Sequence, residues 1–251
     1  MAVNHVPKAQ DQLFTPASTP RQKYASLIVG RDGLAALLKY ETIALVAQHV
    51  PGALGLALRK MLYPFLLGRC GRNVVFGQNV VLRHPHKIRI ADDVVIDDNC
   101  LIDAKGETNT GIRIGSRVFI GRNTILSCKN GDIEIGDGVN IGFNCELFSA
   151  SRVVLGPNVL MAAYGYVVGG DHDFGDPSRP VLAQGRTSAG VTIGEGAWLG
   201  AKAIVLDGTH VGAHAIIGAG AVVRDSVPDG AIAVGLPARV VGTRDGPKTR
   251  D

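Results

Sequence analysis

A repeat of six residues constrains the fold of this chain more than any other feature of its sequence. Between Ile193 and Val227, an aliphatic residue opens most hexads, and the fifth position of each hexad holds Ala, Thr or Val. An amphipathic helix would repeat every three to four residues, and an ordinary strand would alternate every two. The period therefore predicts a solenoid in which each hexad is one flat face and the aliphatic side chains fill a narrow prism.

The same period can be followed back to residue 70, in groups of three hexads. Seven groups begin at Cys70, Ile90, Ile114, Ile135, Leu155, Ile193 and Val211. The extra residues between groups always follow the third hexad, whereas a false register would scatter them over all three corners of a coil. We therefore expect an all-β fold, a parallel β-helix of about seven three-sided coils over residues 70–228, on the order of 30 Å long.

Composition limits the class of protein further. The 33 Gly and 5% aromatic residues suit a tight-turned β solenoid, and a net charge of +4 without a basic block argues against nucleic acid as a partner. Of the four Cys, Cys100 and Cys145 fall in the small fifth position, which favours reduced, buried thiols. The N-terminus lacks the pattern of a signal peptide, so we expect a cytoplasmic protein.

Three flanking segments complete the predicted organisation. Residues 1–22 are rich in Pro and polar residues and are expected to form a mobile arm, and residues 229–251 form a C-terminal extension and tail. Residues 23–69 are helical in character, with a break at Pro51-Gly52. Charged residues interrupt the apolar runs, which argues against a membrane span. The segment either caps the open N-terminal end of the solenoid or, through residues 27–67, makes peripheral contact with the inner face of a membrane.

One long insertion, residues 169–190, is the predicted active-site loop, because long loops on rigid scaffolds tend to carry function. Its only group that titrates near neutrality is His172, which is flanked by Asp171 and Asp173. An imidazole here can take a proton from a hydroxyl or amine that attacks a thioester carbonyl. From the loop alone, a solvated histidine beside two acids is an equal alternative.

The hexad pattern resembles the left-handed parallel β-helix of the hexapeptide-repeat acyltransferases. The loop is similar to that of the maltose, galactoside and xenobiotic acetyltransferase branch, where a His follows the fifth coil. The separation along the sequence from Leu155 to His172 is the same as the corresponding separation in that branch. The resemblance implies that His172 is the general base and that Asn144, with Asp171 and Asp173, contacts the acceptor. The branch usually has Pro directly after the His, where this chain has Asp173.

The resemblance also implies acetyl-coenzyme A as acyl donor, lying along the C-terminal coils, and no metal. Trp198 in AWLG, the only Trp of this chain, matches the Trp of the branch motif. GLPAR resembles the closing motif of the family, so that Arg239 would meet a cofactor phosphate. The expected cofactor contacts are Trp198, Gly200, Ala201, Ala219, Arg224 and Arg239. The family further implies a homotrimer with active sites shared between subunits.

We therefore expect an acetyl-coenzyme A-dependent O-acetyltransferase that modifies a sugar or polysaccharide hydroxyl by direct transfer. An N-acetyltransferase on an amino sugar or sugar nucleotide is the alternative, although residues 1–69 offer no nucleotide-binding Gly-rich loop. A zinc-dependent β-helix resembling carbonic anhydrase and a non-catalytic scaffold are remoter. For zinc, the candidate ligands are His84, His86, His210 and His214, without three of plausible spacing.

Overall fold

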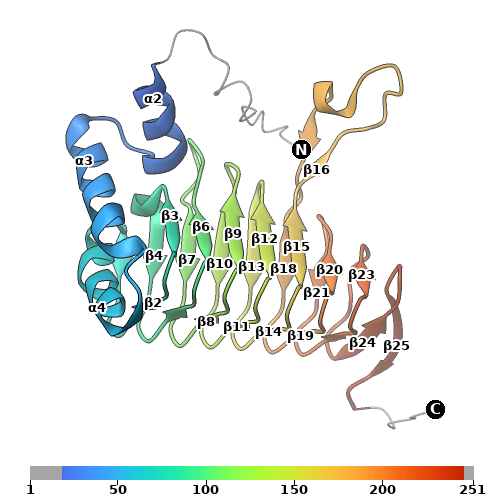
Figure 1. Ribbon diagram of the computed structural model, residues 1–251. Helices are drawn as coiled ribbons and strands as arrows, with labels where there is room; N and C mark the ends of the chain where they lie inside the picture. Colours follow the sequence, from blue (N-terminus) through green and yellow to red (C-terminus); the bar gives the residue numbers. More distant parts are fainter. Residues whose placement is uncertain (1–18, 246–251) are drawn as a thin grey trace.

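The computed structural model describes residues 19–245 and confirms the three-sided parallel β-helix (Figure 1). Seven complete coils each give one strand to each of three parallel sheets, and the predicted register of all seven is correct. Part of an eighth coil follows. Val227 bridges to Val211, and β24 (Ala231–Val234) pairs with β22 of the second sheet. The helix thus runs one partial coil beyond the expected seven, and the antiparallel strand β25 (Arg239–Thr243) covers its last edge.

The strands follow the hexads closely. Sheet A consists of β1 (Arg69–Cys70), β4 (Ile88–Ile90), β7 (Ile112–Ile114), β10 (Asp132–Ile135), β13 (Arg152–Leu155), β18 (Val191–Ile193) and β21 (His210–Val211). Sheet B consists of β2 (Val75–Phe76), β5 (Val95–Ile96), β8 (Phe119–Ile120), β11 (Asn140–Ile141), β14 (Leu160–Met161), β19 (Trp198–Leu199), β22 (Ile216–Ile217), β24 and β25. Sheet C consists of β3 (Val81–Arg83), β6 (Leu101–Asp103), β9 (Ile125–Cys128), β12 (Glu146–Ser149), β15 (Tyr166–Gly169), β20 (Ile204–Val205) and β23 (Val222–Val223).

The core is the column of residues that open the hexads. From Phe76 to Val223 each of them is buried, and only Cys70, at the open end, is partly exposed. Small residues are required where the coils turn: a Cβ on Gly200 would lie 2.6 Å from the backbone nitrogen of Ala219 in the next coil. The insertions all fall between sheets C and A, at one corner of the coil as predicted. We call this edge of the prism the insertion corner.

Helices cover the N-terminal end of the prism (Figure 1). They are α2 (Pro20–Tyr24), η1 (Ala25–Val29), α3 (Leu34–Ile43), η2 (Ala44–Gln48), α4 (Gly52–Leu62) and η3 (Tyr63–Phe65), with a short η4 (Pro85–Lys87) inside the first coil. Helix α2 starts at Pro20, capped by Thr19, so the described end of the predicted arm is helical. The rest of that arm, and the end of the C-terminal tail, lie outside the described residues.

The helices close the edge that the first coil leaves open. In later coils, carbonyl groups on this side accept hydrogen bonds from the preceding coil; Gly77 N–H donates to Ile96 O, for example. Phe76 is the first-coil equivalent of Ile96 and has no preceding coil. Arg59 Nε donates to Phe76 O at 2.9 Å, Tyr63 Oη to Val80 O at 2.9 Å, and Tyr40 Oη to Leu82 O at 2.9 Å. Three side chains of the helical segment thus donate to carbonyl groups of the first coil.

The four cysteines are free thiols, and the fifth-position residues Cys100 and Cys145 are buried as expected. Cys128 is buried as well. Burial raises the pKa of the Cys100 thiol to about 11, which keeps it protonated and unreactive near neutral pH. Among residues 19–245, no helix combines the length and hydrophobicity that crossing a bilayer requires.

Candidate active site

The long insertion folds into a hairpin at the insertion corner, next to the end of β15. Strands β16 (Asp171–His172) and β17 (Arg186–Thr187) pair antiparallel, and a turn of 3₁₀-helix, η5 (Val181–Ala183), lies near the tip. Figure 1 shows the hairpin projecting away from the prism. The sequence predicted a loop here but not its paired strands, because they are too short to show a period-two pattern.

Asp207 fixes the base of the hairpin. Its carboxylate accepts hydrogen bonds from the backbone N–H groups of Ala189 and Gly190, both at 2.8 Å. Ser188 Oγ donates to Gly169 O at 2.9 Å and so joins the two ends of the insertion. These contacts hold the base of the hairpin against a rigid coil.

Replacing Asp207 by alanine should therefore loosen the hairpin without unfolding the prism. Charge-assisted hydrogen bonds to backbone N–H groups are worth about 1.5 kcal/mol or more each, so local opening should become at least about tenfold more frequent. Limited proteolysis within residues 174–187 measures this. Asp137→Ala, which removes a comparable bond to Ser116 N at another corner, is the control. Equal cleavage rates for both variants would contradict the anchoring role.

His172 is half-buried on the hairpin. Its backbone N–H donates to Asp171 Oδ1 at 2.7 Å, while Asp173 accepts a hydrogen bond from Thr187 Oγ1 at 3.3 Å. Neither ring nitrogen of His172 has a hydrogen-bond partner among residues 19–245. Neither Asp171 nor Asp173 therefore orients the His172 ring in the described structure.

Asn144 lies at a different corner of the prism, between sheets B and C. It adopts a left-handed backbone conformation, with a φ of 55°, and accepts a hydrogen bond from Asn123 Nδ2 at 3.0 Å. Asn79 and Asn99 form the same contact in earlier coils. The fold thus gives Asn144 a structural role in a ladder of corner residues. Within one chain it lies across sheet C from the corner that carries His172.

The predicted cofactor contacts gather on the C-terminal coils. Trp198 is 46% exposed on β19, and Gly200 follows directly where the chain turns. Ala201 and Ala219 are exposed and stacked in successive coils, since Gly220 N–H donates to Ala201 O at 2.8 Å. These small residues leave the backbone of the corner between sheets B and C open to a ligand.

The two arginines among the predicted cofactor contacts, Arg224 and Arg239, lie beside one acid. Arg239 Nη1 is 3.1 Å from Asp225 Oδ2, and Arg224 Nε is 3.5 Å from the same oxygen. All three side chains are well exposed, so these pairs are weak and a phosphate could replace the carboxylate.

The histidines weighed as zinc ligands do not converge. His84 is buried, and its Nε2 forms a hydrogen bond of 2.8 Å with Ser26 O. His210 and His214 are exposed on later coils. Within the described part of the chain, no group of three or more His, Cys, Asp or Glu side chains could hold a metal ion.

Comparison with known proteins places this architecture in a known class. A family model described as bacterial transferase hexapeptide (six repeats) matches residues 190–225, the stretch with the most regular hexads. Over 133 residues, 53% of the chain, it is 37% identical to the probable acetyltransferase Rv3034c of Mycobacterium tuberculosis, and the match spans 44% of that protein. Over 111 residues it is 43% identical to nodulation protein L of Rhizobium leguminosarum, spanning 56% of it.

A third relative is matched over more of its length. The chain is 28% identical over 151 residues, 57% of its own length, to the putative lipopolysaccharide biosynthesis O-acetyl transferase WbbJ of Escherichia coli, and the match covers 74% of that protein. The chain therefore spans about half the length of the first two relatives, and more of this one.

Solved structures agree on the fold. AntD of Bacillus cereus, an N-acyltransferase solved in complex with dTDP and 3-hydroxybutyryl-CoA, matches 79% of this chain and 90% of its own, with a TM-score of 0.53 and 20% identity. The polySia-specific acetyltransferase NeuO matches 70% and 84%, with a TM-score of 0.50 and 20% identity. The chain carries the hexapeptide repeat of bacterial transferases, and its fold is that of the hexapeptide-repeat acyltransferases.

Proposed function

We propose that this protein is an acetyl-coenzyme A-dependent acetyltransferase that esterifies a hydroxyl group of a sugar or glycan, with His172 as general base. The observation that carries the proposal is the hairpin itself. The hairpin projects from the β-helix and is anchored to it at its base. The imidazole of His172 on this hairpin has no hydrogen-bond partner among the described residues of its own chain. The acetyltransferase names of the relatives, one of them an O-acetyl transferase, support the same chemistry.

The reaction needs only one proton-transfer group from the protein. His172 accepts the proton of the acceptor hydroxyl as its oxygen attacks the thioester carbonyl. The carbon–oxygen bond forms, the carbon–sulfur bond breaks, and the coenzyme A thiolate leaves and takes up a proton. Near neutral pH a histidine suits this task, since its neutral and protonated forms are both accessible.

A shared active site explains why the predicted residues lie apart in one chain. His172 projects from the insertion corner, and Asn144 and Ala201 lie at the corner between sheets B and C. Packing of prisms around a three-fold axis would bring the hairpin of one subunit to the corner of the next. We propose a homotrimer on this ground. Light scattering that gives the mass of a monomer at working concentration would contradict shared sites.

The experiment that tests the function is thiol release from acetyl-coenzyme A over a panel of acceptors. The panel pairs each sugar with its amino sugar and includes sugar nucleotides. Release that depends on a neutral or acidic sugar hydroxyl is the expected result. AntD, an N-acyltransferase of the same fold, keeps amine transfer as the second candidate. Release with amino sugars alone would favour that candidate.

A further inference from the structure

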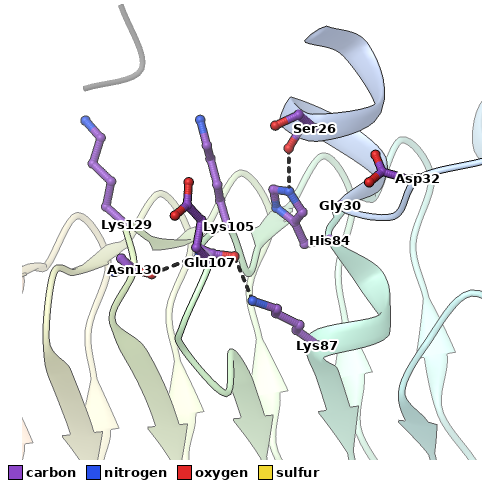
Figure 2. A pocket seen from close by; sticks show the side chains of 10 residues that line it. Ser26, Gly30, Asp32, His84, Lys87, Lys105, Glu107, Lys129 and Asn130 are labelled. Carbon is purple, nitrogen blue, oxygen red and sulfur yellow. Dashed lines mark hydrogen bonds between the residues drawn. The ribbon is translucent and has the colours of Figure 1, made fainter. Parts of the chain in front are cut away.

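A cavity of about 370 Å³ lies at the insertion corner, between the helical cap and the first three coils. The cap contributes Ser26, Gly30 and Asp32 to its lining, and the coils contribute the residues shown in Figure 2. The cap fits closely here. A Cβ on Gly30 would lie 1.8 Å from the ring of His84, and Gly30 has a φ of +70°. The cavity is thus a product of the cap and the prism together.

Lysine side chains from three successive coils line this cavity. Lys87 Nζ is held by Gly106 O at 2.7 Å and Asn109 Oδ1 at 2.9 Å. Lys105 and Lys129 extend side by side in Figure 2, and neither Nζ has a hydrogen-bond or ion-pair partner among residues 19–245. Burial lowers the pKa of both amines, and for Lys129 the positive charges of Arg186 and Lys105 lower it further. Three lysine side chains therefore gather at one cavity. The charge of Asp103 acts on Lys105, but no ion pair within residues 19–245 neutralises Lys105 or Lys129.

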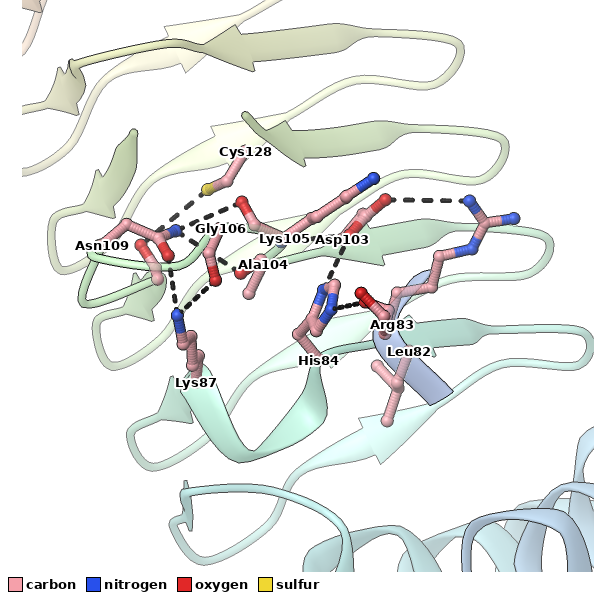
Figure 3. A network of polar contacts seen from close by, with 12 residues as sticks. Leu82, Arg83, His84, Lys87, Asp103, Ala104, Lys105, Gly106, Asn109 and Cys128 are labelled. Atoms are coloured by element: carbon pink, nitrogen blue, oxygen red, sulfur yellow. Dashed lines mark hydrogen bonds and ion pairs between the residues drawn. The ribbon is translucent and has the colours of Figure 1, made fainter. Parts of the chain in front are cut away.

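Asp103, a buried acid next to this cavity, already faces two basic side chains. Figure 3 shows Asp103 between two basic side chains: Arg83 Nη1 lies 3.7 Å away and His84 Nδ1 lies 3.6 Å away. The remaining acids of the cavity, Asp32 and Glu107, are exposed and form no ion pair with the lysines in the described structure. They remain available as hydrogen-bond acceptors.

Arg186 adds a positive charge on the hairpin beside the candidate base. It lies directly opposite His172, and directly opposed residues of antiparallel strands project from the same face. Its charge also lowers the pKa of the Lys129 amine. We call Lys105 and Lys129, at the cavity, together with Arg186, opposite His172, the basic ledge.

We propose that this ledge binds the negatively charged group of the acceptor, and that the acceptor is an acidic saccharide. Its carboxylate or phosphate would lie against Lys105 and Lys129, and its hydroxyl groups would meet Glu107 and Asp32. Amines and carboxylates in one cavity match a molecule that carries both an anion and hydroxyl donors. The identification of an acceptor rests on the proposed function, whereas anion binding by the ledge does not.

Binding without turnover separates the two claims. Calorimetric titrations at low salt use glucuronate, glucose 1-phosphate and glucose, which differ in the charged group. We expect both anionic sugars to bind at least about tenfold more tightly than glucose, and the Lys105→Gln/Lys129→Gln double variant to lose about tenfold of that affinity or more. Lys105→Arg should retain binding. Lys39→Gln, which removes a charge from the exposed side of α3, should match the wild type.

Equal affinities for glucuronate and glucose would overturn the proposal that the basic ledge binds anions. Equal losses of glucuronate affinity in Lys39→Gln and in the double variant would overturn it as well. Inorganic phosphate that binds as tightly as glucose 1-phosphate would overturn the saccharide assignment, because the sugar would then contribute nothing. Thiol release with glucuronate completes the test. Lysine-dependent binding without any acetyl transfer to an acidic sugar would leave the anion site standing and contradict the acceptor assignment.

Discussion

Replacing His172 by alanine is expected to lower kcat by a factor of about 10² to 10⁴, with little change in affinity for acetyl-coenzyme A. His172 is the only histidine of the hairpin, and its ring nitrogens have no hydrogen-bond partner among residues 19–245. The predicted cofactor contacts lie on later coils and do not include it, so donor binding should persist. Steady-state kinetics with an acceptor from the thiol-release panel, together with calorimetry for coenzyme A, measure both quantities.

The matched control is His210→Ala. His210 is exposed on β21, one strand beyond β18 in sheet A and outside the hairpin, and its loss should leave kcat unchanged. Since Asp171 bonds only to the His172 backbone within the described chain, Asp171→Asn should cost much less than His172→Ala. A His172→Ala enzyme with wild-type turnover would remove His172 from the mechanism.

Replacing Arg59 by methionine is expected to reduce the free energy of unfolding by about 3 kcal/mol. Arg59 is only 1% exposed, and its guanidinium donates to Phe76 O, Ala47 O and Val50 O. Methionine keeps most of the volume but supplies no donor, so three carbonyl groups lose their partner at a largely dry interface. Release of the buried charge offsets part of this cost. Urea unfolding measures the change as a shift of midpoint at constant slope.

Lys60→Met is the control for the Arg59 variant. Lys60 is the next residue of α4 and is exposed, so its replacement should change the free energy of unfolding by less than about 0.5 kcal/mol. Tyr63→Phe, which removes only the hydroxyl that donates to Val80 O, should cost about 1 kcal/mol. An Arg59→Met protein as stable as the Lys60 variant would show that the cap does not depend on these bonds.

The repeat was readable in the sequence because each hexad obeys one steric rule. The residue that opens it must fill the prism, and the pattern survives even where Met161 or Cys70 replaces the usual aliphatic residue. The end of the prism was harder to place. Val227 had already been counted as a fifth-position residue, and β24 follows it out of step with the hexads, so the eighth coil was missed.

The cap and the basic ledge could not be predicted in detail, for a physical reason. Arg59 stood in the sequence only as a charge that interrupts an apolar run, and nothing local indicates that its partners would be first-coil carbonyl groups. Lys105 and Lys129 are separated by a full coil, and only the stacking of insertions at one corner brings them together. The signal available was the recurrence of Lys at Lys87, Lys105 and Lys129, each between the start of a third hexad and the start of the next coil.

The most direct test of the central claim is to identify the bond formed by the product. Wild-type protein, acetyl-coenzyme A and a responsive saccharide are incubated, and the saccharide is analysed by mass spectrometry before and after brief treatment with alkaline hydroxylamine, which cleaves oxygen esters and spares amides. We expect an acetylated saccharide whose acetyl group hydroxylamine removes, and whose formation requires His172. An acetyl group that resists hydroxylamine, or no acetylated saccharide with any acceptor of the panel, would contradict the account.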